Sequence, residues 1–180
     1  MSTPVIACLH NLEDAFTGHA GLAIRAAGVE LDERRLRDGE PLPALDEVDG
    51  LLSLGGEQSV LDIGGDPVVG ALPPGAVALH WNEDGFEPPA GAVELLARPA
   101  GTTEAFRYGE SAWGVQFHPE VDPPGLEGWY RAGLAELGEA GVTEEHARAA
   151  DARHLPGQHA LSSALFGGFA RVVAARCVAA

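Results

Sequence analysis

The chain has 180 residues, of which 46% are hydrophobic and 21% charged, so it can form one globular domain with a sizeable core. All 11 of its basic residues are arginine, which excludes a P-loop lysine and a Schiff-base lysine. Its formal net charge of −16 repels phosphate backbones, and we therefore expect no nucleic-acid partner.

The first third of the sequence alternates short apolar runs with one amphipathic segment, a pattern typical of parallel βα units. We expect strands at residues 5–9, 29–36 and 49–54. A helix is expected at residues 18–27, because apolar residues recur there at helical spacing. Gly28 follows it and suits the end of a helix, since glycine accepts a left-handed backbone.

The middle of the chain is rich in β-like runs separated by Pro-Gly turns. These runs cover residues 76–81, 92–97 and 103–117, and Tyr108-Gly109-Glu110-Ser111 is expected to form a hairpin tip inside the last of them. The sequence therefore changes from βα units to hairpins before its helical end.

The last third predicts helices. One is expected at residues 126–137, and Thr143 before two glutamates is a good cap for the next. Pro156-Gly157 is expected to break that helix, with a final amphipathic helix over residues 161–173.

The most informative stretch is Trp113-Gly114-Val115-Gln116-Phe117-His118-Pro119-Glu120. Residues i and i+2 of an extended chain point the same way, so Glu120 can orient the imidazole of His118. A histidine base held by a carboxylate makes up two members of a nucleophilic triad. We therefore name His118 and Glu120 as candidate catalytic residues; the alternative is a pair that only caps the end of a strand.

Several segments resemble, in the same order, the class I glutamine amidotransferases, and in particular stand-alone proteins similar to the glutaminase domain of GMP synthase. The similar segments are residues 49–56 (DGLLSLGG), 80–86 (HWNEDGF), 105–109 (AFRYG), 114–121 (GVQFHPEV) and 164–169 (ALFGGF). They cover most of the chain, and Phe-His-Pro-Glu is specific when it follows a Gly-Val-Gln strand.

The resemblance implies an α/β, flavodoxin-like fold with a mostly parallel sheet and flanking helices, as a single domain over residues 1–180. We divide it into N-terminal βα units (1–56), a shortened junction (57–75), a β-rich part with the His/Glu pair (76–121) and C-terminal helices (124–180). Members of the family hydrolyse the glutamine side-chain amide to glutamate and ammonia. In that reaction a cysteine attacks the amide, a histidine moves the proton and a glutamate holds the histidine.

By this resemblance His118 is the base, Glu120 orients it, and the backbone of Gly55 and Gly56 lines the oxyanion and substrate site. Glutamine is the implied small-molecule ligand, and a synthetase or a second copy is the implied partner. The resemblance implies no cofactor and no metal.

The sequence departs from the family where the cysteine should be. That cysteine lies on a strand-to-helix turn between the Gly-Gly turn and the His-Trp strand. Here only 23 residues separate Gly56 from His80, and none is a cysteine. A strand, turn and crossover helix need about 30 residues. We therefore predict that the nucleophile unit and its central strand are missing, with the join near residues 61–66. In the His-Trp motif itself Asn82 and Glu83 replace the usual His and Gly, and His80 is expected to pack in the core.

Other nucleophiles fit poorly. Cys8 falls inside the first strand, where a small thiol usually packs. Cys177 lies near the end of the last helix, and Ser59 lacks a Gly-x-Ser-x-Gly elbow. The loss of a central strand would expose interior sheet edges. We therefore expect that the strands close around the gap, or that the protein is dimeric or marginally stable.

Three interpretations stay open, and we favour the first. The chain is an amidotransferase relative that no longer hydrolyses glutamine, acting as a binding or regulatory pseudoenzyme. In the second interpretation, the chain is an active hydrolase of altered chemistry, in which His118 activates water or a partner's nucleophile. In the third, it is the truncated product of a glutaminase gene. A flavodoxin-like nucleotide binder is disfavoured, because no glycine-rich phosphate loop opens the first helix.

The N-terminus lacks the basic region of a signal peptide, and no apolar run is long enough to span a bilayer. We therefore expect a cytoplasmic protein without a membrane partner.

Overall fold

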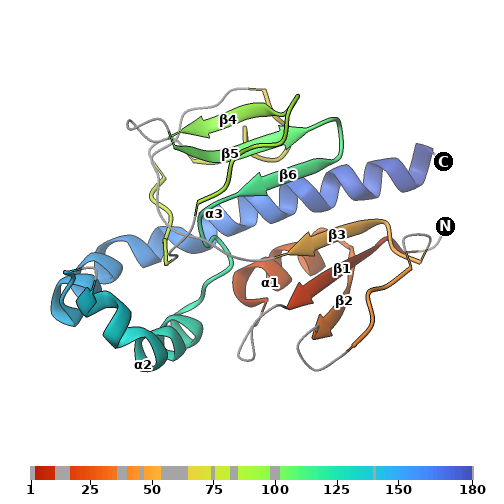
Figure 1. Ribbon diagram of the computed structural model, residues 1–180. Coiled ribbons are helices and arrows are strands. Elements are labelled where there is room, and N and C mark those ends of the chain that lie inside the picture. The colour runs from red at the N-terminus through yellow and green to blue at the C-terminus, as the bar shows by residue number, and fades with distance from the viewer. Residues whose placement is uncertain are drawn as a thin grey trace.

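The computed structural model describes residues 3–10, 17–35, 40–44, 47–53, 65–73, 76–81, 85–97, 102–139 and 141–179. Within these ranges the chain forms six strands and three helices (Figure 1). In chain order they are β1 (Val5–His10), α1 (Gly18–Ala26), β2 (Glu30–Arg35), β3 (Gly50–Ser53), β4 (Val93–Ala97), β5 (Thr103–Tyr108), β6 (Ala112–Val115), α2 (Pro123–Glu139) and α3 (Glu144–Ala179).

The first half is a parallel sheet in the order β2-β1-β3. The central strand β1 pairs with β2 and β3, and its Ile6 and Cys8 are fully buried, which accounts for its apolar sequence. At the edge, β2 carries the sequence ELDERR, which is typical of a charged edge strand. The predicted strands and the first helix are therefore confirmed to within one or two residues.

The second half contains an antiparallel sheet in the order β4-β5-β6. Its predicted hairpin tip is confirmed: Gly109 turns the chain with a φ of 61°, which glycine accepts without strain. Gly114 faces Phe106 across the sheet, and the Phe106 ring lies where a Cβ of residue 114 would be. The expectation of a mostly parallel sheet thus holds only for β1 to β3.

Residues 76–81, expected as a strand, form no continuous ladder; Val77 makes an isolated bridge. The segment runs beside residues 116–118, where the Leu79 carbonyl accepts a hydrogen bond from the His118 amide at 2.8 Å. The chain bends at residues 116 and 117, and β6 ends before them, although the Gln116 amide still donates a hydrogen bond to the Glu104 carbonyl of β5 at 2.9 Å.

The two C-terminal helices are longer than predicted. In α2, Gly133 has non-helical angles, and the Trp81 ring fills the space that a Cβ would need there. The helix α3 runs through Pro156 without a break, so the predicted break is wrong. Proline removes one backbone hydrogen bond. Packing on both sides compensates, because Leu155 contacts the cluster around α2 and Leu161 lies in the main core.

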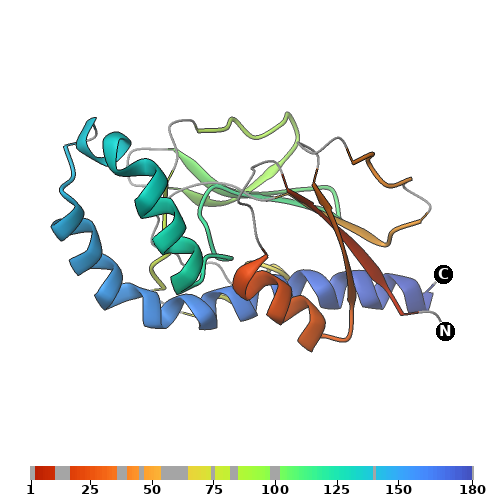
Figure 2. The same ribbon diagram turned by 90° about the horizontal axis from the view of Figure 1, so that it is seen from below.

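The long helix α3 connects the two halves of the molecule. Figure 2 shows it beside α1, and Figure 1 shows it running past both sheets. Its Leu161, Leu165, Phe166, Ala170 and Val173 are buried in the main core. By length and composition alone it could cross a membrane, which the sequence reading did not expect. Its contacts with both sheets account for that apolar character, since a core helix needs a wide apolar face.

The two sheets lie with one edge of each on opposite sides of a gap. One side is the edge of β3 and the other the edge of β6, and within the described residues neither edge pairs with a further strand. A cavity of about 620 Å³ lies between them. In the part of the chain that the structure describes, the strands do not close around the gap. The predicted join near residues 61–66 falls largely in residues 54–64, which lie outside the described part of the chain.

Candidate functional site

The structure brings His118 and Glu120 together in a turn after β6. We expected extended backbone, but β6 ends at Val115 and the chain bends before Pro119. The turn folds the carboxylate back onto the ring, with Nδ1 of His118 2.6 Å from Oε1 of Glu120. The two residues are only 6% and 5% exposed. The contact is thus as predicted, although a turn rather than a strand produces it.

Contacts from four parts of the chain hold this turn. The His118 amide donates to Leu79, and its carbonyl accepts a hydrogen bond from the side-chain amide of Gln158 on α3. The Glu120 carbonyl accepts from the His19 amide at 2.8 Å, at the start of α1. Trp129 on α2 packs edge-on against the imidazole, with ring centroids 4.4 Å apart. The pair is therefore built into the junction of all three helices.

The hydrogen bond from Gln158 to the His118 carbonyl was not predicted from the sequence. Gln158 is 2% exposed in the middle of α3. An amide among the apolar residues of a helix signals a buried polar contact, because burial of an unpaired amide is costly. The sequence could indicate that Gln158 needs a partner, but not that the partner lies 40 residues away.

The hydrogen bonds of His118 limit what its ring can do. Nδ1 faces the carboxylate, so it carries a proton and donates. Nε2 lies 3.4 Å from the backbone carbonyl oxygen of Trp81. A general base needs an Nε2 lone pair directed at an X–H group, and a carbonyl oxygen has no proton to give. In this arrangement the imidazole is oriented by the carboxylate as in a triad, and the described group nearest Nε2 is a carbonyl that offers no proton.

Neither cysteine has the properties of a nucleophile. Cys8 is fully buried in β1, and burial, followed by the negative charges of Glu33 and Glu120, raises its pKa to about 12. Its thiol therefore stays protonated at neutral pH, whereas the thiolate is the reactive form. Cys177 contacts Asp49 at the start of β3, and a hydrogen bond to that carboxylate raises its pKa as well. Cys177 thus lies at the end of the parallel sheet opposite the turn that holds Glu120.

Comparison with known proteins shows which solved structures share this fold. No protein-family model and no curated protein matches the sequence. Solved structures do match. A glutamine amidotransferase from Thermotoga maritima is 17% identical with a TM-score of 0.78, over 96% of this chain and 99% of that one. A glutamine amido transferase from Methylobacillus flagellatus is 16% identical with a TM-score of 0.74, over 94% and 95%.

The chain has the fold of a glutamine amidotransferase. This confirms the class I amidotransferase-like fold that the sequence segments predicted. At this level of identity the likeness concerns the fold alone. The predicted loss of the nucleophile unit and the catalytic roles of His118 and Glu120 remain predictions.

The rest of the predicted amidotransferase site is only partly visible. Gly55 and Gly56, expected at the oxyanion and substrate site, lie outside the described residues, as do Asn82 and Glu83. His80 is buried, as expected of a core residue. Its Nε2 lies 3.4 Å from a carboxylate oxygen of Glu104.

The pairing of Glu104 with His80 is the second interaction that was not predicted from the sequence. Glu104 is fully buried on β5 and forms a second His–Glu pair with His80. Among the described residues no group of three or more His, Cys, Asp or Glu side chains could hold a metal ion.

Proposed function

We propose that this amidotransferase-fold protein does not hydrolyse glutamine by itself and acts as a non-catalytic binding or regulatory member of the family. The observation that carries the proposal is the state of the only two cysteines in the chain. Cys8 is buried with a pKa raised to about 12, and Cys177 lies at the far end of the sheet. The family reaction needs a thiolate beside the histidine.

In this proposal His118 and Glu120 have a structural role. Their hydrogen bond closes the turn onto which α1, α2 and α3 pack, through His19, Trp129 and Gln158. A buried, charge-assisted hydrogen bond fixes that junction more firmly than a neutral one. The pair is therefore useful to the fold without a reaction to catalyse.

The same proposal extends to the setting of the protein. We place it among the stand-alone relatives of the GMP synthase glutaminase domain, because of its Gly-Val-Gln-Phe-His-Pro-Glu segment. We also propose a cytoplasmic location, supported by the use of α3 as a core helix. A synthetase or a second copy of the chain is the proposed partner.

Ammonia release from glutamine tests the proposal. Purified protein is incubated with glutamine, and ammonia is measured by a coupled dehydrogenase assay beside an active glutaminase. We expect no release above the buffer rate, and the same result for His118→Ala. Turnover by the wild type that His118→Ala abolishes would overturn the proposal and favour a hydrolase of altered chemistry.

A further inference from the structure

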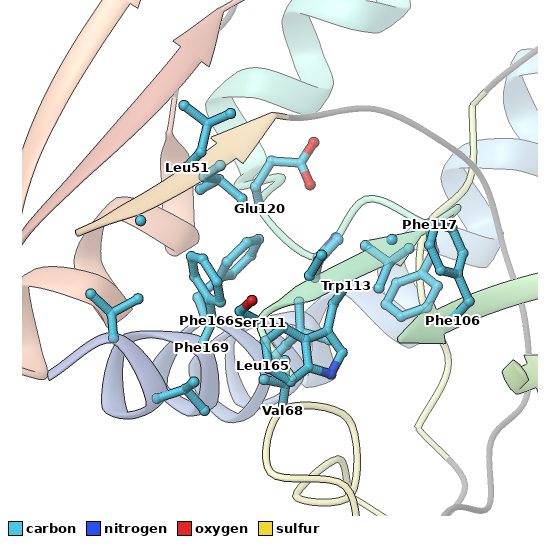
Figure 3. A pocket seen from close by; sticks show the side chains of 18 of the residues that line it. Leu51, Val68, Phe106, Ser111, Trp113, Phe117, Glu120, Leu165, Phe166 and Phe169 are labelled. Carbon is cyan, nitrogen blue, oxygen red and sulfur yellow. The ribbon is translucent and has the colours of Figure 1, made fainter. Parts of the chain in front are cut away.

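A cavity between the two sheets is left unused by the proposed function. Its volume is about 620 Å³, and its lining is mostly apolar. Figure 3 shows Leu51 of β3 and Trp113 of β6 lining the cavity, with Phe166 and Phe169 of α3 between them in this view. We call this space, bounded by β3, β6 and α3, the interstrand slot.

The walls of the interstrand slot are strand edges. The slot is lined by Gly50 to Leu52 of β3 and by Ala112 to Val115 of β6. Within the described residues neither edge pairs with a further strand, and in Figure 1 the arrows of β3 and β6 point the same way. Backbone N–H and C=O groups beside apolar surface need hydrogen-bond partners. An extended segment between these edges would supply them, as in β-strand addition.

The size of the slot fits such a segment. In a sheet a strand rises about 3.3 Å per residue, lies about 4.8 Å from its neighbours and occupies a layer about 10 Å thick, which gives about 160 Å³ per residue. The volume of about 620 Å³ therefore corresponds to roughly four residues. Both β3 and β6 are four residues long.

The charge around the slot selects among possible occupants. Among the described residues, Asp49, Glu87 and Glu120 line it, together with one cation, Arg176. The Arg176 guanidinium lies 3.7 Å from the carboxylate of Glu110, which offsets its charge. The whole chain carries a net charge of −16. At the slot an acidic segment is therefore repelled, and basic residues on either side of an apolar core are attracted.

We propose that the interstrand slot receives an extended apolar segment, flanked by basic residues, from a partner protein. The segment pairs with β3 and β6 and joins the two three-stranded sheets into one sheet of seven strands. Its apolar side chains pack on the aromatic residues of α3. This holds whether or not the chain hydrolyses glutamine.

A synthetic peptide tests the proposal on the full chain. Fluorescein-labelled Lys-Lys-Val-Thr-Val-Thr-Val-Lys-Lys is titrated with protein and followed by fluorescence anisotropy. One control peptide has proline in place of both threonines, which removes backbone donors. A second control has glutamate in place of the lysines. We expect saturable binding of the first peptide and at least tenfold weaker binding of both controls.

A matched pair of variants locates the binding. Ala112→Trp fills the slot from the exposed edge of β6, whereas Ala132→Trp places the same ring on the exposed face of α2. We expect Ala112→Trp to weaken peptide binding at least tenfold and Ala132→Trp to leave it unchanged, with circular dichroism confirming that both fold.

Equal affinity for the proline peptide, preference for the glutamate peptide, or no effect of Ala112→Trp would each overturn the proposal. So would absence of peptide binding together with saturable binding of decanoate, which would make the slot a small-molecule site.

Discussion

Replacement of Glu120 by alanine tests the geometry of the His–Glu pair. The substitution removes the carboxylate that accepts a hydrogen bond from His118 Nδ1 at 2.6 Å. The imidazole stays buried, at 6% exposure, and its Nδ1–H loses this acceptor. Loss of a hydrogen bond to a charged group costs about 1.5–3 kcal/mol, so we expect the free energy of unfolding to fall by about 2 kcal/mol. Glu120→Gln keeps an acceptor oxygen in place and should cost less than about 1 kcal/mol.

Urea denaturation followed by tryptophan fluorescence measures both variants. With a denaturant slope of about 2 kcal/mol per molar, the midpoint of Glu120→Ala should fall by about 1 M, and that of Glu120→Gln by less than about 0.5 M. A larger loss for alanine than for glutamine is the signature of the hydrogen bond. Equal losses for the two variants, or no loss in either, would refute the reasoning.

Three further predictions concern packing, reactivity and pH. Gly114→Ala should lower the free energy of unfolding by about 1–3 kcal/mol, because its Cβ would lie 2.3 Å from the Phe106 ring across the sheet. Gly128→Ala on α2 has open space around its Cβ and should raise the free energy of unfolding by up to about 1 kcal/mol; thermal melts compare the two variants. Iodoacetamide at pH 8 should label Cys177 far faster than the fully buried Cys8. The pKa of Cys8 is raised from 9.0 to about 12, which lowers its thiolate fraction about a thousandfold relative to an unshifted thiol. Peptide mass spectrometry compares the two labelling rates, and equal rates would contradict this prediction. Burial and the neighbouring His159 lower the pKa of His19 in the folded protein, so the unfolded state takes up a proton at a higher pH than the folded state does. Urea midpoints should therefore fall as the pH drops below about 6.5, and they should fall less steeply in His19→Gln.

Local patterns in the sequence were enough to predict much of the fold. The apolar run at residues 5–9 became the buried centre of the parallel sheet, and the charged run at residues 30–35 became its edge. The Thr143 cap is confirmed, since its hydroxyl accepts a hydrogen bond from the His146 amide at 3.2 Å. The contact between His118 and Glu120 was also predictable, because a spacing of two residues keeps the side chains close.

Features that depend on distant contacts were not predictable in this way. Pro156 favours a helix break locally, but packing on both sides keeps α3 continuous. Residues 76–81 have a strand-like composition, yet the segment beside them bends, so no ladder forms. Gln158 contacts His118 and Glu104 contacts His80, in both cases across a long stretch of sequence. The spacing of apolar residues along the chain does not indicate such pairs.

The central claim is that the imidazole of His118 has no thiolate to activate, and covalent trapping tests it most directly. The folded protein is incubated with the electrophilic glutamine analogue 6-diazo-5-oxo-norleucine, beside an active glutaminase, and its intact mass is measured. We predict an unchanged mass while the glutaminase gains one adduct. A stoichiometric adduct on Cys8, Cys177 or any other residue, lost in His118→Ala, would contradict the account.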